Sequence, residues 1–323
     1  MMLFRDKIVL VTRKTRLEEL VERFNTRKQA KFYIEHMGLD FSDYEAEHEV
    51  YADAIRRLKH DLGDLGRKLQ FIDWTYLPNF IFTPNDVALT VGRDGLVVNT
   101  AKFLDGQPLV AVNPDPSRND GILLPFTTET ARDGVSRVLE ERASYHTITM
   151  AEARLNDGQR LLAFNDFYLG QRTHVSSRYS LSWHGKTERQ SSSGVLVSTG
   201  AGSTGWLSST QNMAQAVARL LLDGEAPPLP RLRLTWDDPR LAFVVREPFR
   251  SRASDVRLTA GLIGGGEELR LESHMPEGGV IFSDGVEADT LAFNAGAVAV
   301  VRAADKKTRL VAAEGKEGRQ HAR

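Results

Sequence analysis

A short turn flanked by two glycines holds the first residues whose types and spacing could do chemistry. The turn reads Gly-Arg-Asp-Gly-Leu over residues 92–96 and directly follows an apolar, strand-like segment, Val87–Val91. Ligands of open α/β sheets bind at the carboxyl ends of strands, where glycines let phosphates approach and a helix N-terminus offers unpaired N–H groups. Asp94 would there accept a hydroxyl proton or orient a nucleophile in phosphoryl transfer. The alternative is a tight strand-to-helix turn in which Asp94 is the N-cap.

A loop rich in glycine and hydroxyl residues is the second candidate. It reads Ser-Thr-Gly-Ala-Gly-Ser-Thr-Gly-Trp over residues 198–206, between a strand-like Val195–Val197 and a helical segment from Thr204. Such a loop can lie close against a polar ligand, and Trp206 could stack on a flat ring such as adenine. The alternative is a flexible loop with Trp206 in the core.

Two short polar residues inside an apolar segment form the third candidate. Asn165 and Asp166 interrupt the strand-like stretch Leu161–Leu169. Asn and Asp are depleted from strands. The pair therefore marks either a bulge or sheet edge, or side chains that bind a ligand, and the sequence favours neither.

The elements that must position these residues alternate between strand and helix in the first part of the chain. Short apolar runs bounded by turn residues predict strands, and apolar residues spaced by three and four predict helices. This alternation favours a parallel sheet covered by helices. Ser42 and Glu45 have the spacing of a capping box ahead of the longest helix. The expected strands are 7–12, 69–72, 87–91 and 109–112, and the expected helices are 15–23, 26–37, 42–65 and 95–103.

Beyond about Pro125 the pattern changes to short segments separated by Gly, Asn, Asp and Pro. This pattern predicts a mostly antiparallel β domain, interrupted by one helix over Thr204–Asp223. We expect an α/β domain with a parallel sheet over 1–125, a β-rich domain over 126–313, and a disordered polar tail over 314–323. The strand-like segments of the second domain are 146–149, 161–169, 178–183, 195–198, 241–245, 256–262, 268–272 and 297–302.

Composition excludes several classes of protein. The 323 residues carry 42 Lys and Arg against 43 Asp and Glu, a net charge of −1, which argues against a nucleic-acid partner. There is no cysteine, which excludes disulfides, thiol nucleophiles and Cys-based metal sites. The eight histidines show no metal-ligand spacing, so no protein-held metal is expected. No apolar run approaches the roughly 20 residues that cross a bilayer, and a cytoplasmic protein without a membrane partner is expected.

Together the three candidates resemble the motifs of a known family, the NAD kinases. Residues 92–96 resemble the Gly-Gly-Asp-Gly-Thr motif that NAD kinases share with diacylglycerol kinases and phosphofructokinases. Asn165-Asp166 resembles the family's Asn-Glu/Asp pair, and 198–206 resembles its Ser-Thr-Pro-Thr-Gly-Ser-Thr-Ala-Tyr loop. Further segments resemble the mitochondrial-type branch of the family, namely 8–16, 112–125, 176–178, 192–194, 246–248 and 282–285.

The resemblance implies a fold, a reaction and a set of ligands. It implies an α/β domain and a β domain with the dinucleotide between them. By this resemblance, Asp94 would be the catalytic carboxylate that acts on the 2′-hydroxyl of the adenosine ribose of NAD. ATP would be the donor, Mg2+ the cofactor and NADP the product, and homo-oligomers are common. The residues implied to contact the nucleotides are Gly92, Arg93, Gly95, Asn165, Asp166, Ser193, Thr204, Gly205 and Trp206.

Two residues depart from the family pattern, and both concern the donor site. Arg93 stands where the family has its second glycine, and Leu96 stands where it has threonine. An arginine is tolerated there if its φ is below zero, and its guanidinium could clamp a phosphate. Leu96 offers no hydroxyl. A protein that binds NAD or NADP without catalysis is therefore an alternative to a kinase, as is a kinase that acts on another substrate, such as a lipid or sugar.

Overall fold

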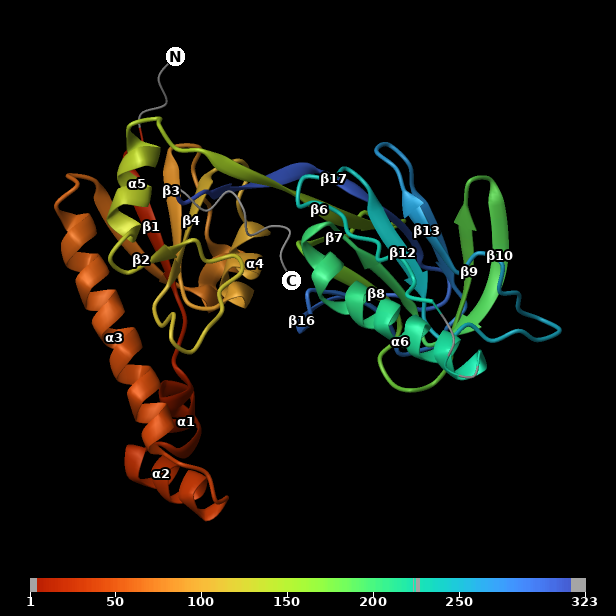
Figure 1. Ribbon diagram of the computed structural model, residues 1–323, viewed down its shortest axis with the longest axis horizontal. Coiled ribbons are helices and arrows are strands. Elements are labelled where there is room, and N and C mark those ends of the chain that lie inside the picture. Colours follow the sequence, from red (N-terminus) through yellow and green to blue (C-terminus); the bar gives the residue numbers. More distant parts are fainter. Residues whose placement is uncertain (1–4, 223, 225–226, 315–323) are drawn as a thin grey trace. The chain divides into compact units, whose positions relative to one another are not determined.

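The computed structural model describes residues 5–222, 224 and 227–314, and these divide into two compact units (Figure 1). The first unit comprises the chain up to His146 and the chain from Thr308 onward, and the second comprises 147–307. The division falls at His146, later than the expected boundary near Pro125, and the first unit also takes the end of the last strand, from Thr308 onward. The tail expected over 314–323 lies outside the described residues from 315 onward.

A parallel sheet forms the centre of the first unit, in the order β2-β1-β3-β4. β3 and β4 are buried along their whole length, as expected for parallel strands covered on both faces. A two-residue strand, β5, and the end of β17 pair in parallel with opposite ends of β4. The strands are β1 (Lys7–Thr12), β2 (Lys68–Asp73), β3 (Asp86–Val91), β4 (Pro108–Asn113), β5 (Phe126–Thr127) and β17 (Val298–Val311).

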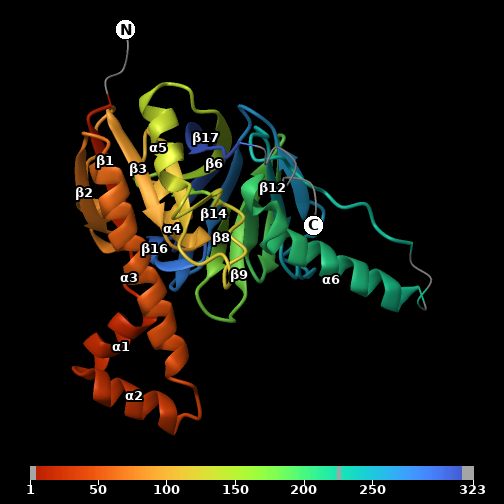
Figure 2. The same ribbon diagram turned by 60° about the vertical axis from the view of Figure 1, so that its left-hand side comes forward.

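Helices cover this sheet, and the longest of them uses the apolar stripe that the sequence indicated. Tyr51, Leu58 and Leu62 of α3 are buried in one cluster with β-strand residues of the first unit. α1 and α2 pack beside the N-terminal part of α3, around Phe41 (Figure 2). The helical elements are α1 (Arg16–Phe24), α2 (Arg27–His36), α3 (Ser42–Gly63), the 3₁₀ turn η1 (Trp74–Asn79), α4 (Asp94–Ala101) and α5 (Ala131–Leu139).

The capping box expected at Ser42 and Glu45 was wrong. Ser42 is the first helical residue of α3, and its N–H donates to the carboxylate of Asp40 at 2.8 Å. A capping box does form at α1, where Thr15 and Glu18 exchange side-chain and backbone hydrogen bonds. The difference arises because a cap residue needs extended backbone, which Thr15 has and the residue before α3 lacks.

The second unit contains antiparallel strands, as the sequence predicted. One sheet has the order β13-β12-β11-β8-β15-β16, and in the other β14 lies between β9 and β17, with β10 beside β9. β6 pairs with β7 and β17. The strands are β6 (Tyr145–Leu155), β7 (Arg160–Ala163), β8 (Asp166–Gln171), β9 (Ser177–Trp183), β10 (Lys186–Ser192), β11 (Val195–Ser198), β12 (Leu241–Val245), β13 (Ala260–Ile263), β14 (Leu269–Ser273), β15 (Gly279–Ser283) and β16 (Val286–Ala292).

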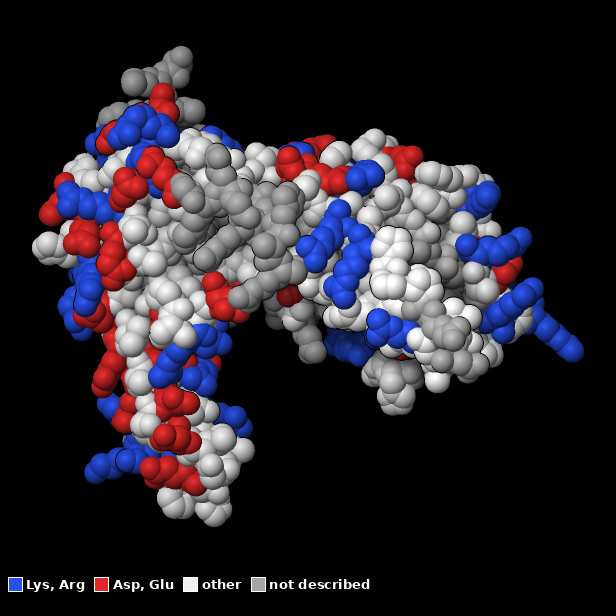
Figure 3. All heavy atoms as spheres, in the orientation of Figure 1, with Lys and Arg blue, Asp and Glu red and all other residues white. Residues whose placement is uncertain are grey.

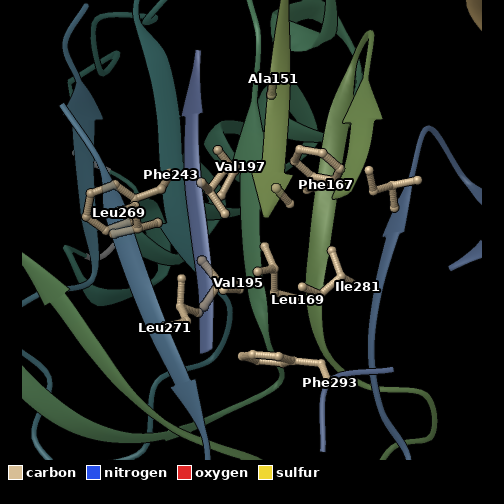
Figure 4. Close-up of a cluster of buried hydrophobic side chains, with 14 of the residues drawn as sticks. Ala151, Phe167, Leu169, Val195, Val197, Phe243, Leu269, Leu271, Ile281 and Phe293 are labelled. Atoms are coloured by element: carbon tan, nitrogen blue, oxygen red, sulfur yellow. The ribbon is translucent and has the colours of Figure 1, made fainter. Parts of the chain in front are cut away.

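The core of the second unit lies on one face of the β8–β11–β12 sheet. Alternate residues of a strand point to opposite faces, so Val195 and Val197 join the cluster that also holds Phe167 and Leu271 (Figure 4). Leu196, between them, joins a smaller cluster with residues of α6 (Trp206–Leu221), which follows the 3₁₀ turn η2 (Ala201–Thr204). This sheet therefore fixes where the loop 198–206 begins.

No helix among the described residues has the length and apolarity needed to cross a membrane. On the face that Figure 3 shows, acidic and basic side chains of the described residues are interspersed, as along α3. On the second unit, the charged side chains visible in that view are mostly basic, with a few acidic ones near its upper edge.

Candidate functional site

The residues that the sequence singled out form two groups, each inside one unit. The Gly-Arg-Asp-Gly-Leu turn lies in the first unit, between β3 and α4. The other candidates lie in the second unit, around the start of β8, the loop before α6 and the connection from β10 to β11.

The turn after β3 begins at the carboxyl end of the parallel sheet. The N–H of Gly92 donates to Val112 O of the neighbouring strand at 3.1 Å. Arg93 is the N-cap of α4, with φ −94° and ψ 169°, and Asp94 is the first helical residue. The negative φ explains why an arginine is tolerated where the resembling motif has glycine. Because Arg93 occupies the N-cap position, the interpretation of Asp94 as the N-cap was wrong.

The carboxylate of Asp94 is held by a loop that lies more than twenty residues further along the chain. Its Oδ1 accepts the N–H of Leu123 at 2.9 Å, and its Oδ2 accepts the N–H of Ile122 at 3.3 Å. An ionised carboxylate offers about four lone-pair sites, so both bonds leave each oxygen able to accept a further proton or hydrogen bond. The position of Asp94 in the first turn of α4 also places its negative charge at the positive end of the helix dipole.

Leu96 and Gly95 show what the turn offers to a ligand. Leu96 is 6% exposed, and a Cβ on Gly92 would lie 3.1 Å from its Cδ2, so its methyl groups pack under the turn. No hydroxyl stands at this position. Gly95 is exposed, and no described atom lies within 4 Å of where its Cβ would be. The backbone at Gly95 is therefore open to a phosphate or a similar group.

A buried network braces the strand ends beside this turn. The hydroxyl of Tyr51 donates to Val91 O at 3.1 Å and accepts the N–H of Arg13 at 3.0 Å, and burial raises its pKa to about 12. Burial opposes ionisation of Glu47, but ion pairs with Arg13 and Arg16 outweigh it and hold the pKa of Glu47 below its usual value. Arg13 and Arg16, which follow β1, thus share the carboxylate of Glu47, and Tyr51 links Arg13 to the end of β3 next to Gly92.

In the second unit, the strand expected over Leu161–Leu169 is broken at the polar pair. β7 ends at Ala163 and β8 begins at Asp166. The carboxylate of Asp284 accepts the backbone N–H groups of three consecutive residues, Phe164, Asn165 and Asp166, at 3.1, 2.6 and 3.3 Å. The N–H of Asp284 in turn donates to Asp166 O at 2.9 Å. A turn 118 residues away in the sequence therefore fixes the shape of this break.

The glycine-rich loop packs directly against the same break. The hydroxyl of Thr199 donates to Phe164 O at 2.6 Å, and its N–H donates to Asn165 O at 2.9 Å. A Cβ on Gly202 would lie only 2.1 Å from Asn165 O, so the loop can approach this closely only with glycine there. The structure thus brings Asn165, Asp166 and the loop 198–206 together.

The side chains of this group divide into those that hold the loop and those that remain accessible. Ser203 is buried and donates to Gly200 O at 2.7 Å, so it is structural. The amide of Asn165 is half-buried and hydrogen-bonds to no other described side chain or backbone group. Asp166 is 8% exposed. Thr204 and Gly205 are exposed at the start of α6, where the first N–H groups of a helix have no partner within the helix itself.

An aromatic group surrounds Trp206. Its ring stacks on Tyr168 with a centroid separation of 6.0 Å and an interplanar angle of 19°, and the guanidinium of Arg246 lies 5.2 Å from its centroid. The hydroxyl of Tyr168 donates to Gln171 O at 2.8 Å and lies 3.2 Å from Ser193 O. Burial raises the pKa of Tyr168, so this hydroxyl stays protonated at neutral pH. Trp206 and Ser193 are thereby linked through one buried ring.

Comparisons with known proteins agree at the level of the fold. No protein-family model matches the chain, and no curated protein matches it. Its structure is similar to the crystal structure of yeast NADH kinase complexed with NADH (TM-score 0.56, 16% identity, 95% of this chain and 84% of that chain). It is equally similar to an NAD kinase from Archaeoglobus fulgidus in complex with ATP (TM-score 0.56, 14% identity, 95% of this chain and 94% of that chain). The chain has the fold of the NAD kinases.

This result confirms the fold class expected from the sequence, an α/β domain with a parallel sheet and a mostly antiparallel β domain. Within this NAD kinase fold, three features of the site were not identified from the sequence. They are the hydrogen bond from the N–H of Leu123 to Asp94, the hydrogen bonds from the N–H groups of residues 164–166 to Asp284, and the stacking of Tyr168 on Trp206. The Asp284-Gly285 turn was a visible signal, whereas a tyrosine within a strand reads as an ordinary core residue.

The three bonds to Asp284 lead to a prediction about stability. We expect Asp284→Asn to lower the free energy of unfolding by about 1.5–3 kcal/mol, because asparagine keeps one acceptor oxygen but turns its NH2 group toward at least one backbone N–H that needs an acceptor. Urea unfolding measures the change. Asp157→Asn is the matched control, since Asp157 is exposed and accepts one backbone N–H, that of Gln159, at 3.0 Å. Equal losses of unfolding free energy in the two variants would mean that the three hydrogen bonds to Asp284 contribute no special stability.

Proposed function

We propose that the protein is a NAD kinase-like phosphotransferase that phosphorylates the 2′-hydroxyl of the adenosine ribose of NAD with ATP, giving NADP. The observation that carries the proposal is the placement of Asp94. Within a fold shared with NAD kinases, this carboxylate stands on a glycine-flanked turn at the carboxyl edge of a parallel sheet, in the first turn of a helix. Ligands of such sheets bind at that edge.

In this mechanism Asp94 acts on the attacking hydroxyl. The ribose 2′-oxygen forms a bond to the γ-phosphorus of ATP while the bond from that phosphorus to the β–γ bridging oxygen breaks, and ADP leaves. The proton of the 2′-hydroxyl passes to the Asp94 carboxylate, whose two oxygens are held by Leu123 and Ile122. Because phosphoryl transfer depends mainly on positioning and electrostatics, a carboxylate with a fixed orientation is well suited to this role.

The remaining residues bind and orient the nucleotides. The open backbone at Gly95 and the exposed side chain of Arg93 would receive phosphates of the donor, while the buried Gly92 shapes the turn beneath them. The unengaged amide of Asn165 would hydrogen-bond the dinucleotide. The further contacts that we propose for NAD are Asp166, Ser193, Thr204, Gly205 and the ring of Trp206.

Mg2+ belongs to the same proposal. Among the residues that the structure describes, no three His, Asp or Glu side chains gather to hold a metal ion. Mg2+ often binds through substrate phosphates and only one or two carboxylates, so a metal that enters with ATP is compatible with the residues present. When bound, it would neutralise charge on the transferred phosphate.

A second candidate function is binding of NAD or NADP without catalysis. The burial of Leu96 against Gly92 favours it, because no hydroxyl stands where the resembling motif has threonine. A kinase acting on a lipid or sugar is less favoured. The aromatic pair of Tyr168 and Trp206 suits a substrate with a flat ring.

An assay for NADP tests the proposal. We expect NADP to form when the pure protein is incubated with NAD, ATP and Mg2+, and calorimetry to detect NAD binding. Parallel reactions replace ATP by polyphosphate and NAD by NADH, which identifies the donor and the acceptor. Binding without any product across these donors would support the second candidate and contradict the first. Absence of both binding and product would contradict both.

A further inference from the structure

We propose that Asn113 is a positioning residue for Asp94, acting through the loop that holds the carboxylate. This inference rests on the proposed function. Asn113 ends β4, is 4% exposed and uses both ends of its amide. Its Nδ2 donates to Asn119 O at 2.9 Å, and its Oδ1 accepts the N–H of Asp115 at 3.0 Å. One buried side chain thereby ties together two points of the loop.

A glycine lets this loop close over the amide. Gly121 has φ +62°, in the left-handed region that favours glycine. A Cβ on Gly121 would lie 2.7 Å from Asn113 Nδ2 and 3.1 Å from the Cβ of Leu124. The N–H of Leu124 donates to Gly121 O at 3.1 Å, which completes a tight turn. The loop can therefore take this course only while the amide of Asn113 and the glycine fit each other.

The same turn presents the two N–H groups that hold Asp94. Ile122 and Leu123 directly follow Gly121, and their N–H groups donate to Asp94 at 3.3 and 2.9 Å. Leu123 is buried and anchors the backbone, whereas the side chain of Ile122 is 69% exposed. The orientation of the Asp94 carboxylate thus depends on the turn, and the turn depends on Asn113. Because misplacement by about 1 Å can cost 10²-fold in rate, a change at Asn113 should reach the chemistry.

The test replaces Asn113 by aspartate, which keeps the shape and the acceptor but turns the donor Nδ2 into an oxygen that faces Asn119 O. We expect kcat for NADP formation to fall at least about 10-fold, with the KM for NAD changed by less than about 2-fold, because the nucleotide contacts proposed in the second unit are untouched. Amide exchange followed by mass spectrometry should show faster exchange over 119–124.

Asn156 provides a matched control. Its Nδ2 donates to Gly296 O at 3.2 Å and its Oδ1 accepts the N–H of Val298 at 3.0 Å, so its amide makes the same two kinds of hydrogen bond in the second unit, at an exposed position. Asn156→Asp should leave kcat, KM and exchange over 119–124 as in the wild type. An equal loss of kcat in both variants would mean that Asn113 has a structural role only, which overturns the proposal.

Other outcomes separate this inference from the proposed function. A wild-type protein that makes no NADP defeats the proposed function, whereas an active enzyme that keeps its kcat in Asn113→Asp defeats the role of Asn113 alone. If Asn113→Asp does not fold, Gly121→Ala distorts the same turn and should give the same fall in kcat at constant KM. Asp94→Ala, which removes both acceptor oxygens, should also speed exchange at 122–123, and wild-type protection there would overturn the proposal without any activity measurement.

Discussion

Replacing Asp94 by asparagine should lower kcat for NADP formation at least about 100-fold, the effect of removing a general base. The asparagine keeps an oxygen that can accept the N–H of Leu123, so the loop that faces it stays in place. It cannot take the proton from the 2′-hydroxyl. The affinity for NAD should change little, because the contacts that we propose for binding are made by residues of the second unit. Steady-state kinetics and calorimetry on the same preparation measure the two effects separately.

The control for this variant is another carboxylate in the first turn of a helix in the same unit. Asp133 lies in the first turn of α5, is exposed and pairs with Arg137 at 3.0 Å. Asp133→Asn should keep the wild-type kcat. If the wild type makes NADP and Asp94→Asn retains more than a tenth of its kcat, proton transfer to Asp94 is not part of the mechanism.

Replacing Gly202 by alanine should damage the second unit and its proposed contact with NAD together. The added Cβ would meet Asn165 O at 2.1 Å and its carbonyl carbon at 2.7 Å, and a backbone group cannot move aside as the end of a side chain can. We expect a loss of about 1–3 kcal/mol in the free energy of unfolding, typical of overpacking. We also expect at least about 10-fold weaker NAD binding, since Asn165 must shift. Urea unfolding and calorimetry measure these quantities.

Gly265 offers the matched control for this substitution. It lies in the exposed turn between β13 and β14, and a Cβ there would have Pro239 Cβ as its nearest neighbour, at 3.7 Å, an ordinary contact. Gly265→Ala should change neither stability nor NAD affinity measurably. If Asn165 binds NAD independently of the loop, the Gly202→Ala protein will be less stable but will bind NAD with wild-type affinity.

Elements with a strong local pattern could be predicted closely from the sequence. β1, β11 and β12 have the bounds that their apolar runs indicated, because these strands are mostly apolar and buried along most of their length. β10 was not predicted, because its sequence, Lys-Thr-Glu-Arg-Gln-Ser-Ser, is polar and yet buries Glu188 and Gln190. α5 was not predicted either, because it contains Gly134, which is unfavourable inside a helix. The ring of Phe126 packs there, and a Cβ on residue 134 would lie only 2.7 Å from it.

By itself the sequence determined which short segments could carry chemistry, because a glycine-flanked turn after a strand and a polar pair inside an apolar run are local patterns. Only the tertiary structure decided what holds those segments in place. Leu123 reaches Asp94 across 29 residues, and Asp284 reaches Asn165 across 119. Such bonds depend on how the strands are ordered in each sheet, and no pattern of neighbouring residues encodes them. The candidate acid–base group is therefore readable in the sequence, whereas its orientation is a property of the fold.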